Sequence, residues 1–142
     1  MQVLIDANVL IDFLTHREPF YENAKRVISC CLFTVNGCIA PHSFVEIFYV
    51  LHEREKRSIE ECRESILKLC AVFDVASENK ATIINAAKNL GFNDFEDALQ
   101  NEAAITSNVD YIITRNKKDF VNSVIPVLLP EEFLQTQSVL QA

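Results

Sequence analysis

The sequence predicts an α/β protein with a mostly parallel central sheet of about five strands and helices on both faces. Three observations support this prediction. Short runs of β-forming residues alternate with longer helical patterns, and the first run is apolar throughout, as in a strand buried on both faces. Only two glycines and four prolines interrupt the 142 residues, without a linker or repeat, so we expect one domain over residues 1–142.

The predicted strands alternate with the predicted helices. The strands cover residues 3–5, 34–40, 72–75, 111–114 and 124–128. The helices cover residues 20–31, 43–54, 58–70, 79–90, 94–106 and 131–137. Phe44, Ile47 and Phe48 recur at helical spacing in the second helix, and Ser58 with Glu61 forms a capping-box pattern at the start of the third. Right-handed crossovers would place these helices on both faces of the sheet.

Composition restricts the possible function. The hydrophobic fraction of 49% fits a soluble protein, and no apolar stretch reaches the length of a membrane span, so we expect a cytoplasmic protein without a membrane partner. The net charge of −7 argues against a broad basic surface for nucleic acid, but it permits an acidic metal site with local basic patches. The five cysteines contain no CxxC pair, which argues against a zinc ribbon and a disulfide framework.

Asp6 is the most informative residue of the chain. It follows the apolar run at residues 3–5, and apolar residues resume after Asn8. An ionised carboxylate inside a buried strand is costly unless it is paired or bound to a metal. We therefore expect Asp6 at the end of the strand, where a helix begins. In open α/β sheets, ligands and metals bind at this edge.

Four further acidic residues could share that edge. Glu46 lies within the apolar segment 44–48, which predicts that two faces of its helix are buried; a surface ion pair with Arg54 is the alternative. Asp94 and Asp97 lie in the first turn of a predicted helix, where Asp94 could instead be a cap and Asp97 could complement the helix dipole. Asp119 follows the fourth strand and could be an ordinary loop residue.

Carboxylates gathered at one edge would repel one another unless a cation neutralised them. Mg²⁺ prefers oxygen ligands, retains several waters and can activate water for in-line attack on a phosphodiester. The three histidines show no metal-ligand spacing. Neither GxxxxGK[ST] nor GxSxG is present, which argues against P-loop and nucleophile-elbow enzymes.

Five segments of the sequence form a recognisable pattern by their order and spacing. They are LIDANVLID, HREPFYENA, SFVEIFYVL, DFEDALQNEAA and VDYIITRNKKDF. In this order and spacing they resemble the PIN domain family, in particular its VapC-type toxin ribonucleases, over nearly the whole chain. The resemblance implies a Rossmann-like (PIN-like) fold and RNA cleavage that depends on Mg²⁺ or Mn²⁺.

The resemblance also assigns roles to acidic residues. Asp6, Glu46 and Asp97 match the first three acidic positions, which are catalytic and bind the metal, and Asp94 is an additional carboxylate ligand one turn earlier. The fourth acidic position of the family usually follows the Thr–Arg pair, where this chain has Asn116. An amide cannot be a charged ligand, although Asn116 could ligate through its oxygen or hold a metal-bound water.

Other residues would support the site in the family geometry. Asp94 or Asp119 could compensate for the missing acid. Asn8 and Thr114 would hydrogen-bond to Asp6, to a water or to a phosphate, although Thr114 could equally be a plain strand residue. Three basic residues beside the proposed site could contact RNA phosphates, or could belong to a solvated loop. They are Arg115, Lys117 and Lys118.

Three hypotheses for function follow. The first is a metal-dependent endoribonuclease, the toxin of a type II toxin–antitoxin system, with RNA as substrate, an antitoxin as partner and a homodimeric state by family analogy. The second, motivated by Asn116, is a catalytically weak PIN-like module that binds RNA or protein. The third is a phosphotransferase with Asp6 as nucleophile, which ranks lower because its signature needs an aspartate where Asn8 stands.

Overall fold

Five parallel strands form the centre of the molecule. The computed structural model describes residues 1–141, with side chains described through residue 138. The strands of its sheet are β1 (Gln2–Ile5), β2 (Asn36–Ile39), β3 (Asp74–Val75), β4 (Tyr111–Ile113) and β5 (Val127–Leu128). Their order is β3-β2-β1-β4-β5, and every neighbouring pair is parallel. The predicted α/β class and mostly parallel sheet are confirmed.

Within the described residues, six α-helices lie between these strands and a seventh follows the last strand. They are α1 (Ala7–Leu14), α2 (Tyr21–Phe33), α3 (Pro41–Tyr49), α4 (Ile59–Val72), α5 (Lys80–Lys88), α6 (Phe95–Thr106) and α7 (Pro130–Gln141). The predicted helix over residues 43–54 divides into α3 and a π-helical segment, η1 (Val50–Arg54), and a short 3₁₀ segment, η2 (Lys117–Phe120), follows β4. The capping box predicted at the start of α4 is present, because Ser58 accepts a hydrogen bond from the Glu61 amide at 3.1 Å.

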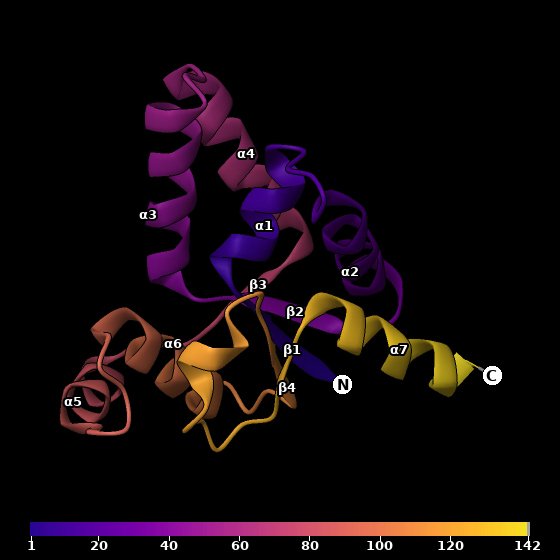
Figure 1. Cartoon of the computed structure of the whole chain (residues 1–142). Coiled ribbons are helices and arrows are strands. Elements are labelled where there is room, and N and C mark those ends of the chain that lie inside the picture. The colour runs from indigo at the N-terminus through magenta and orange to yellow at the C-terminus, as the bar shows by residue number, and fades with distance from the viewer. Residues whose placement is uncertain (142) are drawn as a thin grey trace.

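The helices cover both faces of the sheet (Figure 1). Alternate residues of β1 point to opposite faces. Val3 and Ile5 pack in the larger core with residues of α1, α2, α3, α4 and α7. Leu4 packs in a second core with Ala103 and Ala104 of α6, and α5 lies against α6. Val3, Leu4 and Ile5 of β1 are fully buried, which explains why this part of the strand is apolar, whereas Gln2 at its start is exposed.

The strand order places a topological switch point next to β1. The chain runs from β1 to β2 and β3 on one side, then crosses to β4 and β5 on the other. The connections that leave β1 and β4 therefore diverge at the carboxyl ends of these two strands, which is where open α/β sheets bind ligands. Asp6 and Thr114 are the first residues beyond those ends.

Two other expectations from the sequence concern the cysteines and membrane-spanning segments. Cys31, Cys38 and Cys62 are buried, whereas Cys30 is partly buried, Cys70 is exposed, and all five are free thiols. None of the helices in the described part of the chain is long and apolar enough to cross a membrane.

Candidate functional site

Asp6 occupies the junction between the central strand and the first helix. Its backbone is extended, with φ −69° and ψ 149°, and its amide still donates to the Ile113 carbonyl of β4 at 3.0 Å. Its side chain caps α1 by accepting a hydrogen bond from the Ala7 amide at 2.7 Å. The position predicted from the cost of burying a charge in a strand is thus confirmed.

Four donors surround the Asp6 carboxylate. Oδ1 accepts from the Ala7 amide and, at 3.4 Å, from Nε2 of Gln100. Oδ2 accepts from Oγ1 of Thr114 at 2.7 Å and from Nδ2 of Asn8 at 3.3 Å. All four donors are neutral, so they orient the carboxylate without supplying a compensating charge.

Burial raises the pKa of Asp6 despite these donors. Loss of solvent contributes most, the hydrogen bonds from Thr114 and Ala7 lower the pKa, the charge of Glu96 raises it, and His42 lowers it slightly. Loss of solvent therefore outweighs the hydrogen bonds, and none of the four donors supplies a positive charge. A bound cation would supply that charge.

Thr114 lies at the centre of the hydrogen bonds around Asp6. It is fully buried, and its hydroxyl donates to Asp6 while accepting from Asn8 at 3.1 Å and from the Asn116 amide at 3.0 Å. Asn8 in turn accepts from the Arg115 amide at 3.3 Å. The hydroxyl therefore connects the segment that follows β1 with the segment that follows β4. Thr114 thus does more than the alternative reading, an ordinary strand residue, would require.

Asp97, in the first turn of α6, lies within electrostatic range of Asp6. The pKa of Asp97 is raised to about 7, first by burial and then by the charges of Asp94, Asp119, Asp6 and Glu96. Asp94 caps α6 by accepting from the Asp97 amide at 3.0 Å, so its alternative role as a cap is real.

Glu46 approaches Asp6 from α3. Partial loss of solvent raises its pKa to about 7, although the residue keeps an exposed side. A hydrogen bond with Glu96 and the charges of Glu96 and Asp6 add to this rise, and Arg54 opposes it. The expectation that two helix faces around Glu46 are buried is wrong. Glu46 itself is exposed, and so are Val45 and Tyr49, because α3 packs on the core mainly through Ser43 and Ile47.

These carboxylates do not converge on one point. Among the side chains that the structure describes, no three His, Cys, Asp or Glu residues lie close enough together to ligate one metal ion. The candidate ligands are nevertheless all carboxylates, whose oxygens suit a hard cation rather than Zn²⁺ with sulfur and nitrogen ligands. Mg²⁺ keeps several waters and needs only one or two carboxylates, so the residues fit a hydrated divalent cation.

Sequence reasoning missed three residues of this site. Glu96 acts electrostatically on Asp6, Glu46 and Asp97. Gln100 contacts Asp6, one helical turn after Asp97, and the spacing of the two residues was the available signal.

The third residue is His42, which no sequence pattern indicated. It is hydrogen-bonded through Nδ1 to Glu78, and both side chains are mostly buried. His42, Glu46 and Glu96 also line a groove of about 530 Å³ between α3 and α6.

The three predicted basic residues, Arg115, Lys117 and Lys118, differ in their partners. Arg115 forms two hydrogen bonds to the buried Asp12, from Nε at 2.5 Å and from Nη2 at 3.1 Å. Its guanidinium carbon lies 4.0 Å from the centre of the Phe20 ring. Lys117 pairs with Glu132 of α7 at 3.0 Å, whereas Lys118 is exposed.

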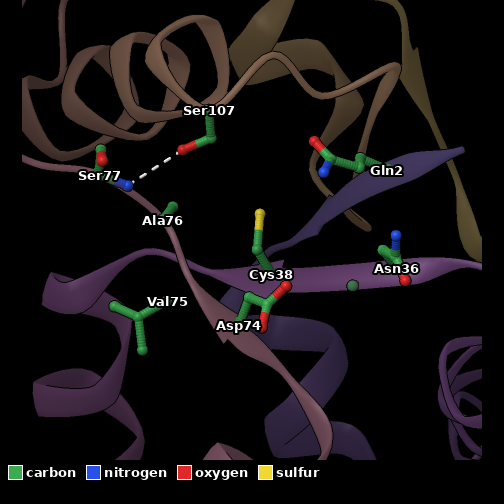
Figure 2. A pocket seen from close by; sticks show the side chains of 9 residues that line it. Gln2, Asn36, Cys38, Asp74, Val75, Ala76, Ser77 and Ser107 are labelled. Atoms are coloured by element: carbon green, nitrogen blue, oxygen red, sulfur yellow. Dashed lines mark hydrogen bonds between the residues drawn. The ribbon is translucent and has the colours of Figure 1, made fainter.

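A separate pocket of about 240 Å³ contains none of the predicted site residues (Figure 2). Cys38 and Asp74 line it, and a hydrogen bond from the Ser77 amide to Ser107 closes one side at 3.0 Å. Burial raises the pKa of the Cys38 thiol to about 11, so this thiol stays protonated and is a poor nucleophile. The carboxylate region is therefore the stronger candidate.

This chain is similar to known proteins in sequence and in fold. A family model described as "PIN domain" matches residues 2–118. A sequence search of curated proteins finds no significant match.

Three solved structures illustrate the similarity of the fold. VapBC-1 from nontypeable Haemophilus influenzae has a TM-score of 0.69 at 18% identity, covering 92% of this chain and 99% of that one. A toxin–antitoxin complex from Klebsiella pneumoniae has a TM-score of 0.68 at 20% identity, covering 90% and 97%. VapC20 from Mycobacterium tuberculosis, a sarcin-ricin loop cleaving toxin, has a TM-score of 0.63 at 13% identity, covering 78% and 86%.

Proposed function

The chain belongs to the PIN domain family, as its sequence predicted, and from this premise we propose that it is a metal-dependent endoribonuclease that hydrolyses RNA phosphodiester bonds. One observation carries the proposal. At the switch point of the sheet, the Asp6 carboxylate is held by four neutral donors while further carboxylates act on it. This arrangement orients a negative charge and leaves it without a counter-ion inside the protein.

We propose that Asp6 would hold Mg²⁺ or Mn²⁺ directly and that Glu46, Asp97 and Asp94 would act on the hydrated ion through its waters. When bound, such a cation stabilises charge on a phosphodiester and lowers the pKa of a water. Burial, and then repulsion by neighbouring carboxylates, raises the pKa values of Glu46 and Asp97 to about 7. The repulsive part supports this assignment, because a cation would relieve it.

The protein's own groups have separable roles in the proposed reaction. Thr114 and Asn8 keep the Asp6 carboxylate in one orientation. Glu46 and Asp97 can accept a proton from the attacking water, since a carboxyl with a pKa close to 7 is suited to proton transfer at neutral pH. The donors on both Asp6 oxygens disfavour the alternative of Asp6 as a nucleophile towards phosphorus.

Lys118 and Asn116 are the groups on the β4 side that we assign to RNA. Both side chains are exposed beside the candidate site, and Asp119 in the same turn acts on Asp97. The Arg115 guanidinium is already engaged by Asp12 and Phe20, so we assign it a bracing role and leave phosphate contacts to Lys118 and, after release from Glu132, to Lys117.

We also propose that the protein is the toxin of a type II toxin–antitoxin pair. The support is the likeness of the fold to the toxin–antitoxin complex from Klebsiella pneumoniae and to VapC20, a sarcin-ricin loop cleaving toxin. An antitoxin protein is then the expected partner, and a cytoplasmic homodimer is the expected state. Co-expression with the product of an adjacent small gene, followed by co-purification, would test the partner.

A second candidate function is a PIN-like module that binds RNA or protein with little catalysis. It is favoured by Asn116 in place of an acid and by the absence, among the described side chains, of three ligands within reach of one ion. It predicts binding of RNA without metal-dependent turnover.

An RNA cleavage assay separates the two functions. Purified wild type, Asp6→Asn and Asp97→Asn would be compared with Mg²⁺, with Mn²⁺ and with EDTA. We expect cleavage by the wild type with a divalent cation only, and none by either variant. Asp74→Asn, the same exchange at an exposed residue outside the site, is the matched control and should cleave like the wild type. Equal cleavage by all four proteins would defeat the assignment of the site.

A further inference from the structure

Gln100 is a buried polar residue beside the candidate site. It lies in α6, one turn after Asp97, and only 2% of its surface is exposed. Its Nε2 donates to Oδ1 of Asp6 at 3.4 Å. Gln100 thus connects α6 with the junction of β1 and α1.

The other end of the same amide has no protein partner. Oε1 of Gln100 is the one buried side-chain nitrogen or oxygen in the described residues without a hydrogen bond. Folded proteins rarely leave such an atom unpaired, because a buried acceptor that has lost water and gained nothing is unfavourable. An apolar side chain of similar length would fill the same space without this cost, so packing alone does not explain a glutamine here.

Turning the amide over does not remove the problem. In the reversed orientation Oε1 would face the Asp6 carboxylate, two acceptors with no proton between them, and the NH₂ group would be unpaired instead. The orientation with Nε2 towards Asp6 is therefore the favourable one. Since both amide atoms are bonded to the same carbon, a group that donates to Oε1 must lie in the immediate neighbourhood of Asp6.

We propose that Gln100 is a positioning residue for the cation: Nε2 fixes the Asp6 carboxylate, and Oε1 accepts a hydrogen bond from a water that hydrates the bound ion. This inference rests on the proposed function. A ribose hydroxyl of the RNA is the other O–H group that could reach Oε1. Mg²⁺ and Mn²⁺ sites that keep part of their hydration shell present water protons to the surrounding protein, which favours the water.

Gln100→Met tests this proposal, because methionine has nearly the same length and no acceptor. Mn²⁺ binding would be measured by calorimetric titration in the absence of RNA, together with thermal unfolding in EDTA and cleavage kinetics. We expect the dissociation constant for Mn²⁺ to rise by about 10-fold or more, the range known for residues that orient metal ligands. We also expect a lower kcat at unchanged KM and an unfolding temperature in EDTA that is not lower than that of the wild type.

Thr82→Val is the matched control. Thr82 is also 2% exposed, and valine has its shape, but its hydroxyl bonds only to Asn79 in the cap of α5. This variant should unfold at a lower temperature and keep the Mn²⁺ affinity of the wild type. Gln100→Leu provides a second apolar variant should Gln100→Met not fold.

The results of these measurements distinguish failure of the role proposed for Gln100 from failure of the proposed function. Wild-type Mn²⁺ affinity in both apolar variants, together with Mn²⁺-dependent cleavage by the wild type, would overturn the role of Gln100 and leave the proposed function standing. A change confined to KM for RNA would also overturn it, since that result assigns Oε1 to the substrate. A wild type that neither binds Mn²⁺ nor cleaves RNA would overturn both proposals.

Discussion

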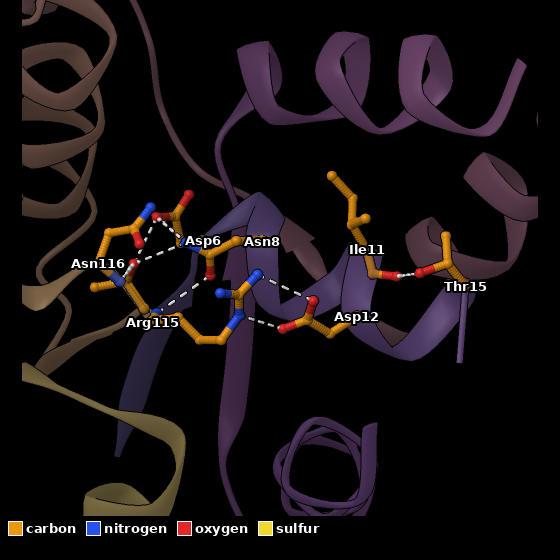
Figure 3. A network of polar contacts seen from close by, with 8 residues as sticks. Asp6, Asn8, Ile11, Asp12, Thr15, Arg115 and Asn116 are labelled. Atoms are coloured by element: carbon orange, nitrogen blue, oxygen red, sulfur yellow. Dashed lines mark hydrogen bonds and ion pairs between the residues drawn. The ribbon is translucent and has the colours of Figure 1, made fainter. Parts of the chain in front are cut away.

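Two aspartates on the first 12 residues of the chain have opposite environments (Figure 3). Asp6 bonds to Thr114, and Asp12 bonds to Arg115, so both tie α1 to the end of β4. Asp12 is 1% exposed and meets a guanidinium through two hydrogen bonds, whereas Asp6 meets only neutral donors. Burial raises the pKa of both carboxyl groups, but Asp12 has a cationic partner in Arg115, and none of the hydrogen-bond donors to Asp6 is charged.

This difference separates the carboxylate that we assign to the stability of the fold, Asp12, from the one that we propose for cation binding, Asp6. A carboxylate paired with arginine stabilises the fold once formed, and breaking that pair is costly. A carboxylate held by neutral donors among other acids keeps its affinity for a cation from outside. The identity of the residue is the same in both cases, and the neighbouring charge decides its role.

The largest expected effect is the loss of activity in Asp6→Asn. We expect RNA cleavage to fall by more than the roughly 10–100-fold typical of residues that only orient a metal ligand. The free energy of unfolding in EDTA should change by less than about 1 kcal/mol, because an uncompensated charge is removed together with its hydrogen bonds. Cleavage kinetics and urea unfolding of the same preparation measure both quantities, and a large loss of stability would place Asp6 in the structural class.

Asp12→Asn should have the opposite signature. It leaves Arg115 without its carboxylate, and we expect a loss of about 3 kcal/mol in the free energy of unfolding, the lower end of the range for broken buried pairs, since 22% of the Arg115 side chain is exposed. Activity per folded molecule should stay close to that of the wild type below the unfolding transition. Urea unfolding measures the loss, and an unchanged midpoint would remove the contrast with Asp6.

Thr114→Val should give an intermediate result. Valine preserves the shape but removes the hydroxyl that donates to Asp6 and accepts from Asn8. We expect about a 10-fold loss of cleavage, by the same outer-shell reasoning, and about 1 kcal/mol of stability. Thr114→Ser, which keeps the hydroxyl, should recover most of the activity; failure of serine to do so would assign the loss to packing.

The smallest expected effect is a pH dependence of stability in EDTA. The pKa values of Glu46 and Asp97 are about 7 in the folded protein, above their ordinary values of 4.5 and 3.8. Between those limits the folded state binds more protons than the unfolded state, so their contribution is fully present below about pH 4 and is lost as the pH rises through about 7.

Thermal unfolding between pH 4 and pH 8 checks this slope. Asp97→Asn should reduce it, and saturating Mn²⁺ should reduce it in the wild type, because a cation favours the ionised carboxylates. A contribution of the opposite sign, with Asp97→Asn making the protein relatively less stable at pH 8, would contradict the crowding of these acids.

The sequence predicted those features of the site and fold that depend on residues adjacent in the chain. Asp6 was predictable because a charge cannot remain inside an apolar strand, and the capping box at Ser58 and Glu61 was predictable because it depends on adjacent residues. Thr114, Asn8 and Asp97 followed from the resemblance to the family.

The remaining residues could not be predicted because they depend on packing between distant segments. The Asp12–Arg115 pair spans 103 positions and Gln100–Asp6 spans 94. Glu46 was expected between buried faces because its neighbours are apolar, yet α3 leaves Val45 and Tyr49 exposed, at 73% and 59%. The spacing of apolar residues indicates that a segment is helical, but it does not show which of those residues pack in the core.

Thermal unfolding with and without Mn²⁺ tests the central claim most directly, since a ligand that binds the folded state raises its unfolding temperature. The wild type, Asp6→Asn and Asp12→Asn would be compared at pH 7. We predict that Mn²⁺ raises the unfolding temperature of the wild type and of Asp12→Asn by similar amounts and leaves that of Asp6→Asn unchanged. An equal rise in all three proteins, or no rise in the wild type, would contradict the claim that Asp6 is the carboxylate left free for a cation.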